Sequence, residues 1–452
     1  MSQLNVGFGR VNITPAMGTP IGGYYVVRLA DRVLDELEAN AVAFALGEKR
    51  ALLISADISG LFYEFAEPIC QHIAQVTGVP SDAIFLTCTH THTGPEANIN
   101  RRIVPDKQET YLSFLRTRLA DAAMFALQDL KPARMGWGVG QAPGIAFIRR
   151  YRMKDGSTRT NPGINNPDVL APIGEVDESV GVVRFDREDG ETIVLANIGI
   201  HPDTVGGCGI SADWPGFTRR ILEKTIDNTR CVLLNGAQGD VNHVNTAPAP
   251  GQNNDLTMDF DDCMRGYGHA RHMGMTVAGA VMQVYSKVAY VPADSLHTRK
   301  QVIRHPANMP APEELPLARR YNQLHQEGRD DLIPFSGMQL TTVVAEAERM
   351  VQLEHGPEHF DLCMTALTIG DIALAGFPGE PFSAIGRAVK AAPGWQLVLP
   401  MCCTNGYEGY FPTMDAYLEG GYEARSSIFR PGVAEAVAEA SLALLRDIRG
   451  AM

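Results

Sequence analysis

The chain has 452 residues, of which 45% are hydrophobic and 20% are charged, proportions that are ordinary for a soluble globular protein. Its 52 acidic side chains outnumber its 39 basic ones, so the formal net charge is -13 and we expect no nucleic acid partner. It contains no long apolar run and no basic, then apolar, N-terminal segment, so we expect neither a transmembrane helix nor a signal peptide. The eight cysteines form no C-x-x-C pair, which predicts reduced thiols and a cytoplasmic protein.

Short apolar runs alternate with amphipathic segments along the chain. The runs predict buried strands over Ala51–Ala56, Ala83–Thr87, Thr192–Ile200, Cys231–Leu234, Ile372–Ala375 and Trp395–Leu399. Periodic apolar positions predict helices over Tyr111–Leu127, His269–Tyr285, Thr341–Leu353 and Val433–Leu445. Asp-Gly pairs in MKDGST and REDGET predict two hairpin tips. We therefore expect an α/β protein in which helices flank a large mixed β-sheet core, within a single domain over residues 1–452.

The segment from residue 300 to 335 differs in composition from its surroundings. It contains HPANMPAPEELP and is rich in proline and charge. Two interpretations are open: a linker between two domains, or a lid or excursion within one domain. We favour the second, because the polar clusters on both sides of the segment are expected to form one site. Its role in substrate selection is a hypothesis.

Nearly every apolar run ends in a cluster of polar residues. AIFLTCT leads to His90 and His92, TIVLANIGI to His201, CVLLNGAQG to Asp240 and His243, IALAGFPG to Glu380, and WQLVLPMCCTNG to Tyr407, Tyr410, Tyr417 and Tyr422. Open α/β sheets place their sites beyond the carboxyl ends of strands, so we expect these clusters to converge on one cleft. Histidines together with a carboxylate are a common ligand set for catalytic zinc, although the spacing alone does not identify the metal.

Several motifs follow one another in a fixed order over nearly the whole chain. They are ITP, GGY, CTHTHTGP (Cys88–Pro95), FIRRY (Phe147–Tyr151), IHPDT (Ile200–Thr204), SADWPG, GAQGDVN, FPGEPF and the tyrosine block NGYEGYFPTMDAYLEGGYEARSS. In this order they resemble the catalytic domain of the neutral/alkaline non-lysosomal ceramidases. The resemblance implies a neutral-ceramidase-like catalytic fold. Because the chain ends soon after the tyrosine block, we expect no C-terminal immunoglobulin-like domain, which the classical ceramidases have.

The resemblance also assigns roles to individual residues. It implies that the zinc ligands are His90, His201, Glu380 and Tyr410. It implies substrate-side catalytic roles for His92, Tyr422 and Arg149, with Arg150 as the rival assignment for the arginine. Asp240 and His243 have two open interpretations, a second ion site or a hydrogen-bonded turn at a strand end.

These residues predict a zinc-dependent hydrolase that cleaves a C–N amide bond with a metal-activated water. His92 would manage protons, and Tyr422 with Arg149 would stabilise the oxyanion that forms on attack. We expect a small soluble amide, N-acyl amine or lactam as substrate rather than ceramide. The alternatives are an ester, lactone or glycoside-like bond at the same zinc site, or a non-catalytic metal-binding protein. We expect no stable membrane association, and a homo-oligomer is expected only on base rates.

Overall fold

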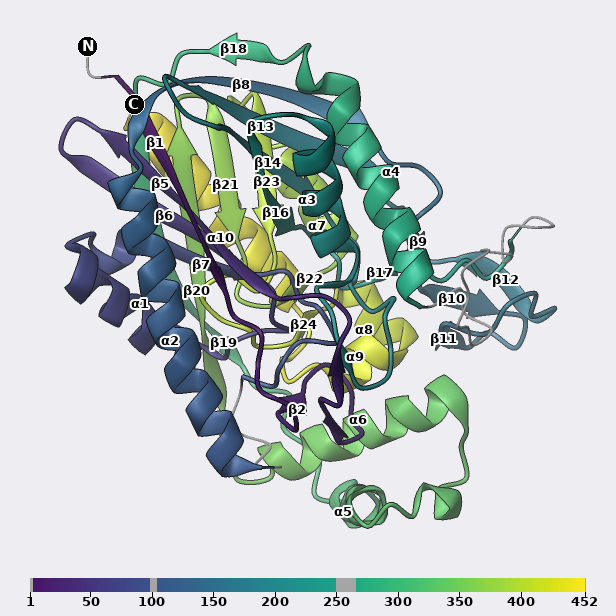
Figure 1. The fold of residues 1–452 in the computed structure, drawn as a ribbon. Helices are drawn as coiled ribbons and strands as arrows, with labels where there is room; N and C mark the ends of the chain where they lie inside the picture. The colour runs from purple at the N-terminus through teal and green to yellow at the C-terminus, as the bar shows by residue number, and fades with distance from the viewer. Residues whose placement is uncertain (1–2, 98–103, 249–265, 452) are drawn as a thin grey trace.

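The computed structural model describes residues 3–97, 104–248 and 266–451 (Figure 1). Its α-helices are α1 (Tyr63–Thr77), α2 (Pro105–Gln128), α3 (Asp213–Thr225), α4 (Tyr267–Tyr285), α5 (Leu315–Gln326), α6 (Gly337–Leu353), α7 (Ser383–Lys390), α8 (Met414–Glu419), α9 (Tyr422–Ser426) and α10 (Val433–Gly450). Short 3-10 helices span Ser81–Ala83 and Asp330–Leu332. None of the helices within the described ranges is both long and apolar enough to cross a membrane.

The larger sheet has nine strands in the order β16-β14-β13-β8-β1-β5-β6-β7, with β18 paired to β8. Its strands are β1 (Asn5–Asn12), β5 (Glu38–Leu46), β6 (Lys49–Ala56), β7 (Ile84–Cys88), β8 (Lys131–Gln141), β13 (Ser179–Arg187), β14 (Thr192–Ile198), β16 (Thr229–Asn235) and β18 (Ala289–Val291). Neighbouring strands are antiparallel except for β6 with β7 and β14 with β16. The sheet is therefore mixed, as predicted.

The larger sheet folds back on itself at the short pairing between β1 and β8. Only Asn5 and Val6 of β1 pair with β8. Beyond that point β16 approaches β6, where the Ser55 hydroxyl donates to the Leu233 carbonyl at 2.7 Å. The Phe44 and Phe185 rings, from opposite halves of the sheet, lie 5.5 Å apart. Strands β7 and β14 run in opposite directions within the sheet, yet the rings of His90 and His201, which follow them, lie 5.2 Å apart.

A second sheet closes the remaining side of the core. It has the order β19-β20-β21-β23, formed by β19 (Leu296–Pro306), β20 (His359–Ile369), β21 (Ile372–Gly376) and β23 (Leu397–Met401). The shorter strands are β2 (Pro20–Ile21), β3 (Arg28–Leu29), β4 (Arg32–Val33), β9 (Phe147–Ile148), β10 (Arg150–Met153), β11 (Thr158–Thr160), β12 (Val169–Pro172), β15 (Gly209–Ile210), β17 (Val241–Asn242), β22 (Glu380–Pro381) and β24 (Tyr410–Phe411). One buried cluster joins the two halves of the larger sheet with the second sheet, through residues such as Phe44, Phe185, Leu367 and Leu399.

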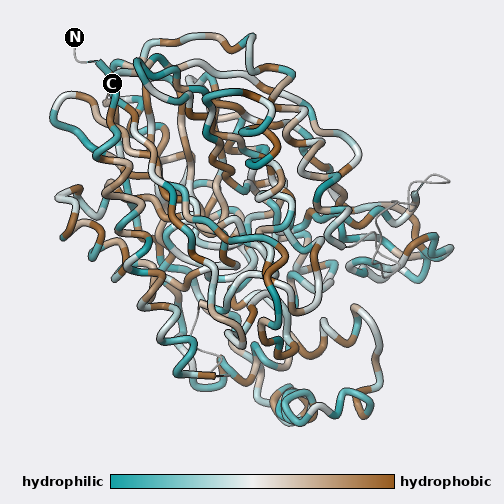
Figure 2. The backbone as a smooth tube through the Cα atoms, in the orientation of Figure 1, coloured by the Kyte–Doolittle hydropathy of each residue, from teal (hydrophilic) through white to brown (hydrophobic). Residues whose placement is uncertain are grey.

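Helices cover the outer faces of these sheets (Figure 1). Helix α2 packs on β1 and β5, α4 on β8 and β13, and α7 and α10 on the second sheet. Glycine permits the closest of these contacts: a Cβ on Gly7 would lie 1.9 Å from the Ala126 carbonyl oxygen of α2. A Cβ on Gly140 would lie 2.1 Å from the Ala280 carbonyl oxygen of α4. Figure 2 shows much hydrophobic chain within the sheets, whereas the outlying helix α5 is largely hydrophilic.

The predicted elements can now be compared with the observed ones. The predicted strands correspond to β6, β7, β14, β16, β21 and β23, and the predicted helices to α2, α4, α6 and α10. Both Asp-Gly turns join antiparallel strands, β10 to β11 and β13 to β14. The predicted α/β class with a large mixed sheet is thus confirmed. The described cysteines are free thiols, and Cys263 lies outside the described residues.

The segment 300–335 has two structural parts. Residues 300–306 belong to β19, an edge strand of the second sheet whose side chains are mostly exposed or half-buried. The sequence analysis did not predict β19, because an edge strand with polar, exposed side chains contains no apolar run. The remainder leads into α5, which pairs with α6 as a helical hairpin beside α9.

Candidate metal centre

The polar clusters that follow the strands converge on one buried place. His90 and His92 follow β7, and His201 follows β14. Glu380 opens β22 and pairs with Tyr410 of β24 in a parallel register. These short strands lie where the ends of β21 and β23 meet the larger sheet, near the middle of the molecule in Figure 1. The structure thus brings together the clusters that contain His90, His201, Glu380 and Tyr410, whereas the side chains of Asp240 and His243 have other neighbours.

Three imidazoles and one carboxylate form the core of this centre. His90, His92 and His201 each offer a nitrogen to one cluster whose atoms all lie within 4.8 Å of one another. His90 Nε2 lies 3.2 Å from His92 Nε2. Glu380 Oε2 lies 2.9 Å from His201 Nε2 and 3.4 Å from His90 Nε2. His90, His201 and Glu380 are 1%, 0% and 0% exposed, so water does not separate them.

Backbone carbonyls fix the tautomers of two of these histidines. His90 Nδ1 hydrogen-bonds to the Ser59 carbonyl, and His201 Nδ1 to the Gln238 carbonyl at 2.7 Å. A carbonyl only accepts, so each Nδ1 carries a proton and Nε2 is the nitrogen directed at the centre. The backbone of His90 lies in the left-handed region (φ 71°), a strained conformation for a residue with a Cβ. Such buttressed imidazoles are typical of metal ligands.

The distances between donor atoms fit a small divalent metal. Donors bound tetrahedrally to zinc at ~2.0–2.1 Å stand about 3.3 Å from one another. The separations of 2.9 Å between Glu380 and His201 and 3.4 Å between Glu380 and His90 lie around this value. A buried carboxylate among neutral imidazoles is also the donor set that zinc prefers. The residues present therefore fit such an ion.

The charge states of the donors depend on one another, and a metal would have to displace the proton that Glu380 holds on His90. Burial raises the pKa of Glu380, but His90 and His201 outweigh burial and hold it well below its ordinary value. Burial lowers the pKa of His90, yet the Glu380 carboxylate raises it to about 8. Burial holds the pKa of His92 well below its ordinary value, and burial with the Arg149 charge lowers that of His201. His92 and His201 are thus neutral near pH 7, the state that a metal requires.

Arg149 reaches the centre and Arg150 does not. Arg149 Nη1 lies 3.5 Å from His201 Nε2, Nε donates to Glu423 at 2.6 Å, and Nη2 donates to the Gly239 carbonyl at 2.7 Å. Arg150 instead donates to Glu419 and to the Gly420 carbonyl, both at 3.2 Å. Neighbouring residues of an extended chain point to opposite sides, so only one of the pair can face the histidines.

Tyr410 and Tyr422 border the centre together with Arg149. The Tyr410 ring is stacked 6.3 Å from the His201 ring and lies 5.6 Å from the Tyr422 ring. The Arg149 guanidinium lies 5.3 Å from the centre of the Tyr410 ring and 5.8 Å from that of Tyr422. Burial raises the pKa of Tyr410 well above its ordinary value, while Arg149 opposes this. Tyr410 is therefore a neutral phenol unless a metal displaces its proton.

Sequence reasoning assigned no role to three further residues of this centre. Tyr407 donates its hydroxyl to Glu380 Oε1 at 2.9 Å. Asp203 Oδ1 lies 3.6 Å from His92 Nδ1 and accepts the Tyr24 hydroxyl. Glu423, which holds Arg149, also accepts the Thr160 hydroxyl at 2.9 Å. Tyr407, Asp203 and Glu423 all stand inside motifs already singled out, but nothing in the motifs shows which oxygen or nitrogen each one meets.

Asp240 and His243 lie apart from the centre. Asp240 Oδ1 accepts the Ser383 N–H at 2.6 Å, and Oδ2 accepts the Ser383 hydroxyl at 3.0 Å. Both carboxylate oxygens of Asp240 therefore accept hydrogen bonds from the first residue of α7. His243 is buried, and its ring lies 6.1 Å from that of His269. These contacts favour the hydrogen-bonded-turn interpretation for Asp240.

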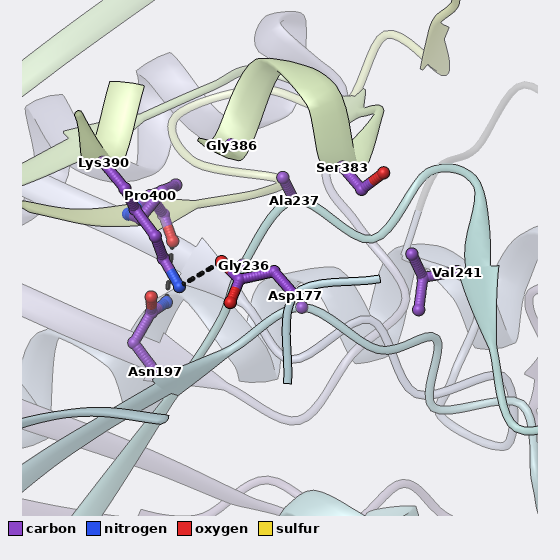
Figure 3. Close-up of a pocket in the computed structure, with 10 residues that line it drawn as sticks. Asp177, Asn197, Gly236, Ala237, Val241, Ser383, Gly386, Lys390 and Pro400 are labelled. Carbon is purple, nitrogen blue, oxygen red and sulfur yellow. Dashed lines mark hydrogen bonds and ion pairs between the residues drawn. The ribbon is translucent and has the colours of Figure 1, made fainter. Parts of the chain in front are cut away.

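A small cavity lies behind the loop that follows β16 (Figure 3). Its volume is about 10 Å³, room for one water molecule at most. On one side Lys390 Nζ contacts Asp177 at 2.8 Å, and the Asn197 amide donates to the Pro400 carbonyl at 2.7 Å. None of the histidines of the centre lines it. This cavity is too small to receive a substrate.

The chain has a ceramidase-like fold. The neutral ceramidase from Pseudomonas aeruginosa matches it with a TM-score of 0.75 and 17% sequence identity, over 99% of this chain and 75% of that one. A ceramidase complexed with C2 matches with a TM-score of 0.73 and 17% identity, over 99% and 76%. No protein-family model matches the sequence, and a search of curated proteins gives no match. The fold that the motifs predicted is confirmed; the roles of individual residues stay predictions.

Proposed function

We propose that this chain is a zinc-dependent hydrolase that cleaves the C–N bond of a small soluble amide, N-acyl amine or lactam. The observation that carries the proposal is the geometry of the buried donors. His90 and His201, each locked by a backbone carbonyl, aim Nε2 at Glu380 Oε2 over 3.4 and 2.9 Å. A buried carboxylate needs compensating positive charge, and a metal ion held between Glu380 and the two imidazoles would supply it.

His90, His201, Glu380 and Tyr410 are the ligands in this proposal, and His92 belongs to the same cluster. Zinc, when bound, lowers the pKa of water towards ~7 and polarises a carbonyl oxygen. The remaining requirements of amide cleavage fall to the side chains around it. They are a group that moves a proton to the departing amine and groups that stabilise negative charge on the amide oxygen.

His92 is the residue we assign to proton transfer. It is 8% exposed, against 1% for His90 and 0% for His201, so it is the histidine of the cluster that a substrate reaches first. Arg149 and Tyr422 are assigned to the oxyanion. The Arg149 guanidinium is held charged by Glu423 at 2.6 Å and lies beside both tyrosine rings. A preformed cation in a buried site stabilises developing charge without reorganising.

The accessible side of the centre favours a polar substrate. His92, Arg149 and Tyr410 are 8%, 6% and 9% exposed, and each presents a hydrogen-bonding group. The solved neighbours are described as ceramidases, so a lipid amide belongs in the same substrate panel as soluble amides. We further propose a cytoplasmic protein with a small-molecule substrate and no nucleic acid partner, which the free thiols and the net charge of -13 support.

Metal content tests the proposal directly. Purified wild type, His90→Ala and His355→Ala are compared by ICP mass spectrometry. His355 is a surface histidine whose side chain is 89% exposed, so its loss controls for adventitious binding. We expect about one zinc per chain in wild type and in His355→Ala, and none in His90→Ala. An amide library with ester and lactone analogues then assigns the bond. Wild type that binds no zinc contradicts the proposal.

A further inference from the structure

The two oxygens of Glu380 have different partners. Oε2 faces the imidazoles of His201 and His90, and Gln238 Nε2 donates to it at 3.3 Å. Oε1 accepts the Tyr407 hydroxyl at 2.9 Å. The two carboxylate oxygens therefore differ: Oε1 accepts a hydrogen bond from a phenol, and Oε2 faces the imidazoles of the centre.

Tyr407 is itself held in place by the segment that precedes α1. Its ring stacks on Phe62, with centroids 6.0 Å apart and an interplanar angle of 16°, and lies 5.4 Å from the His90 ring. Gly60 makes room for it, because a Cβ there would lie 2.5 Å from Cγ of Tyr407. The next residue, Glu408, accepts the N–H of Tyr63 at 2.8 Å. The phenol is thus directed at Glu380 before any ligand binds.

We propose that Tyr407 is a positioning residue that holds Glu380 as a one-oxygen ligand of the metal. A carboxylate can bind a metal through one oxygen or through both. With His90, His201, Glu380 and Tyr410 as ligands, water or substrate would be a fifth ligand, and a second carboxylate oxygen would compete for that position. By engaging Oε1, Tyr407 keeps that position open for water or substrate. This inference rests on the proposed metal centre and adds to it the residue that sets how Glu380 binds.

Tyr407→Phe removes only the hydroxyl, and Tyr417→Phe is its matched control. Tyr417 is half-buried, as Tyr407 is, and donates its phenol hydroxyl to the Phe429 carbonyl at 2.7 Å instead of to Glu380. Zinc affinity is measured by competition with a chromophoric chelator, and coordination by the visible spectrum of the cobalt(II)-loaded protein. We expect Tyr407→Phe to bind zinc about 10- to 100-fold more weakly, as losses of such supporting hydrogen bonds do, and to show weaker cobalt bands as coordination number rises. Tyr417→Phe should match wild type in both.

The outcomes separate the possible failures. If zinc affinity or the cobalt spectrum of Tyr407→Phe equals that of wild type, the positioning role is wrong while the metal centre stands. If wild type binds neither zinc nor cobalt, both the proposed function and this inference are wrong. Circular dichroism of the metal-free variants checks folding. In a Glu380→Gln background the added Tyr407→Phe change should cost no further affinity; an equal additional loss would overturn action through Glu380.

Discussion

The buried ion pair between Asp57 and Arg219 supports the loop that carries His90. Asp57 directly follows β6, and Arg219 of α3 donates two hydrogen bonds to it, one of 2.9 Å. Asp57 also accepts the Glu38 N–H at 2.9 Å and the hydroxyl of Thr89, the neighbour of His90, at 3.2 Å. Asp57 is 0% and Arg219 1% exposed. Removing one partner leaves a charge buried without its counterion.

We therefore predict that Arg219→Met lowers the free energy of unfolding by about 3–5 kcal/mol, the range for breaking a buried pair. We expect a loss near the lower end of this range, because Asp57 keeps its hydrogen bonds from the Glu38 N–H and the Thr89 hydroxyl. For 452 residues, with an unfolding entropy of about 2.1 cal/mol/K per residue, 3 kcal/mol lowers the unfolding temperature by roughly 3 °C. Arg319→Met, which breaks a pair with Glu354 whose arginine is 56% exposed, should cost much less, because water screens exposed ion pairs.

Urea unfolding followed by circular dichroism measures these differences, and calorimetry gives the temperatures. A double variant, Asp57→Asn with Arg219→Met, sharpens the test. Because it removes both charges, it should be more stable than Arg219→Met alone. If Arg219→Met costs no more than Arg319→Met, or if the double variant is less stable than both single ones, the burial argument is wrong.

The remaining predictions concern the arginines and the thiols. Arg149→Lys should lower kcat on an amide substrate by about 10²–10³-fold, as loss of an oxyanion donor does, whereas Arg150→Lys should change it little; equal losses in steady-state assays would refute the assignment. Burial raises the pKa of Cys231 to about 12, so its thiol should resist iodoacetamide at pH 8.5, while the partly exposed Cys208 should react; peptide mass spectrometry reads both. Because the folded pKa of Cys231 exceeds the unfolded value near 9, its contribution to stability is complete below pH 9 and declines as pH rises towards 12.

The sequence revealed the elements better than their arrangement. Strands buried on both faces, such as β14 and β16, are continuous apolar runs and were predicted with nearly correct bounds. The bend of the larger sheet at β1 and β8 was not predicted, because it depends on pairings between residues far apart in the chain, such as Asn5 with Pro132. The edge strand β19 was missed because its exposed side chains carry no apolar signal.

The candidate site shows a similar division. His90, His92, His201 and Glu380 were singled out by their positions after apolar runs, and the structure brings them together. The choice between Arg149 and Arg150 stayed open, because adjacent residues in an extended segment differ only in the side they face. Tyr407 could not be separated from the other tyrosines of its block, since its distinguishing feature is a single hydrogen bond to a residue of another segment.

The donor atoms of the centre come from distant parts of the chain. His90 belongs to one half of the larger sheet, His201 to the other half, and Glu380 with Tyr410 to the segments around the second sheet. No fragment that lacks any of these parts contains the whole set. Metal should then bind only when the entire fold has formed. A tightly bound ion should also stabilise all three parts together, since it binds the folded chain and not the unfolded one. A truncated chain that retained the metal would show that one part assembles the centre without the others.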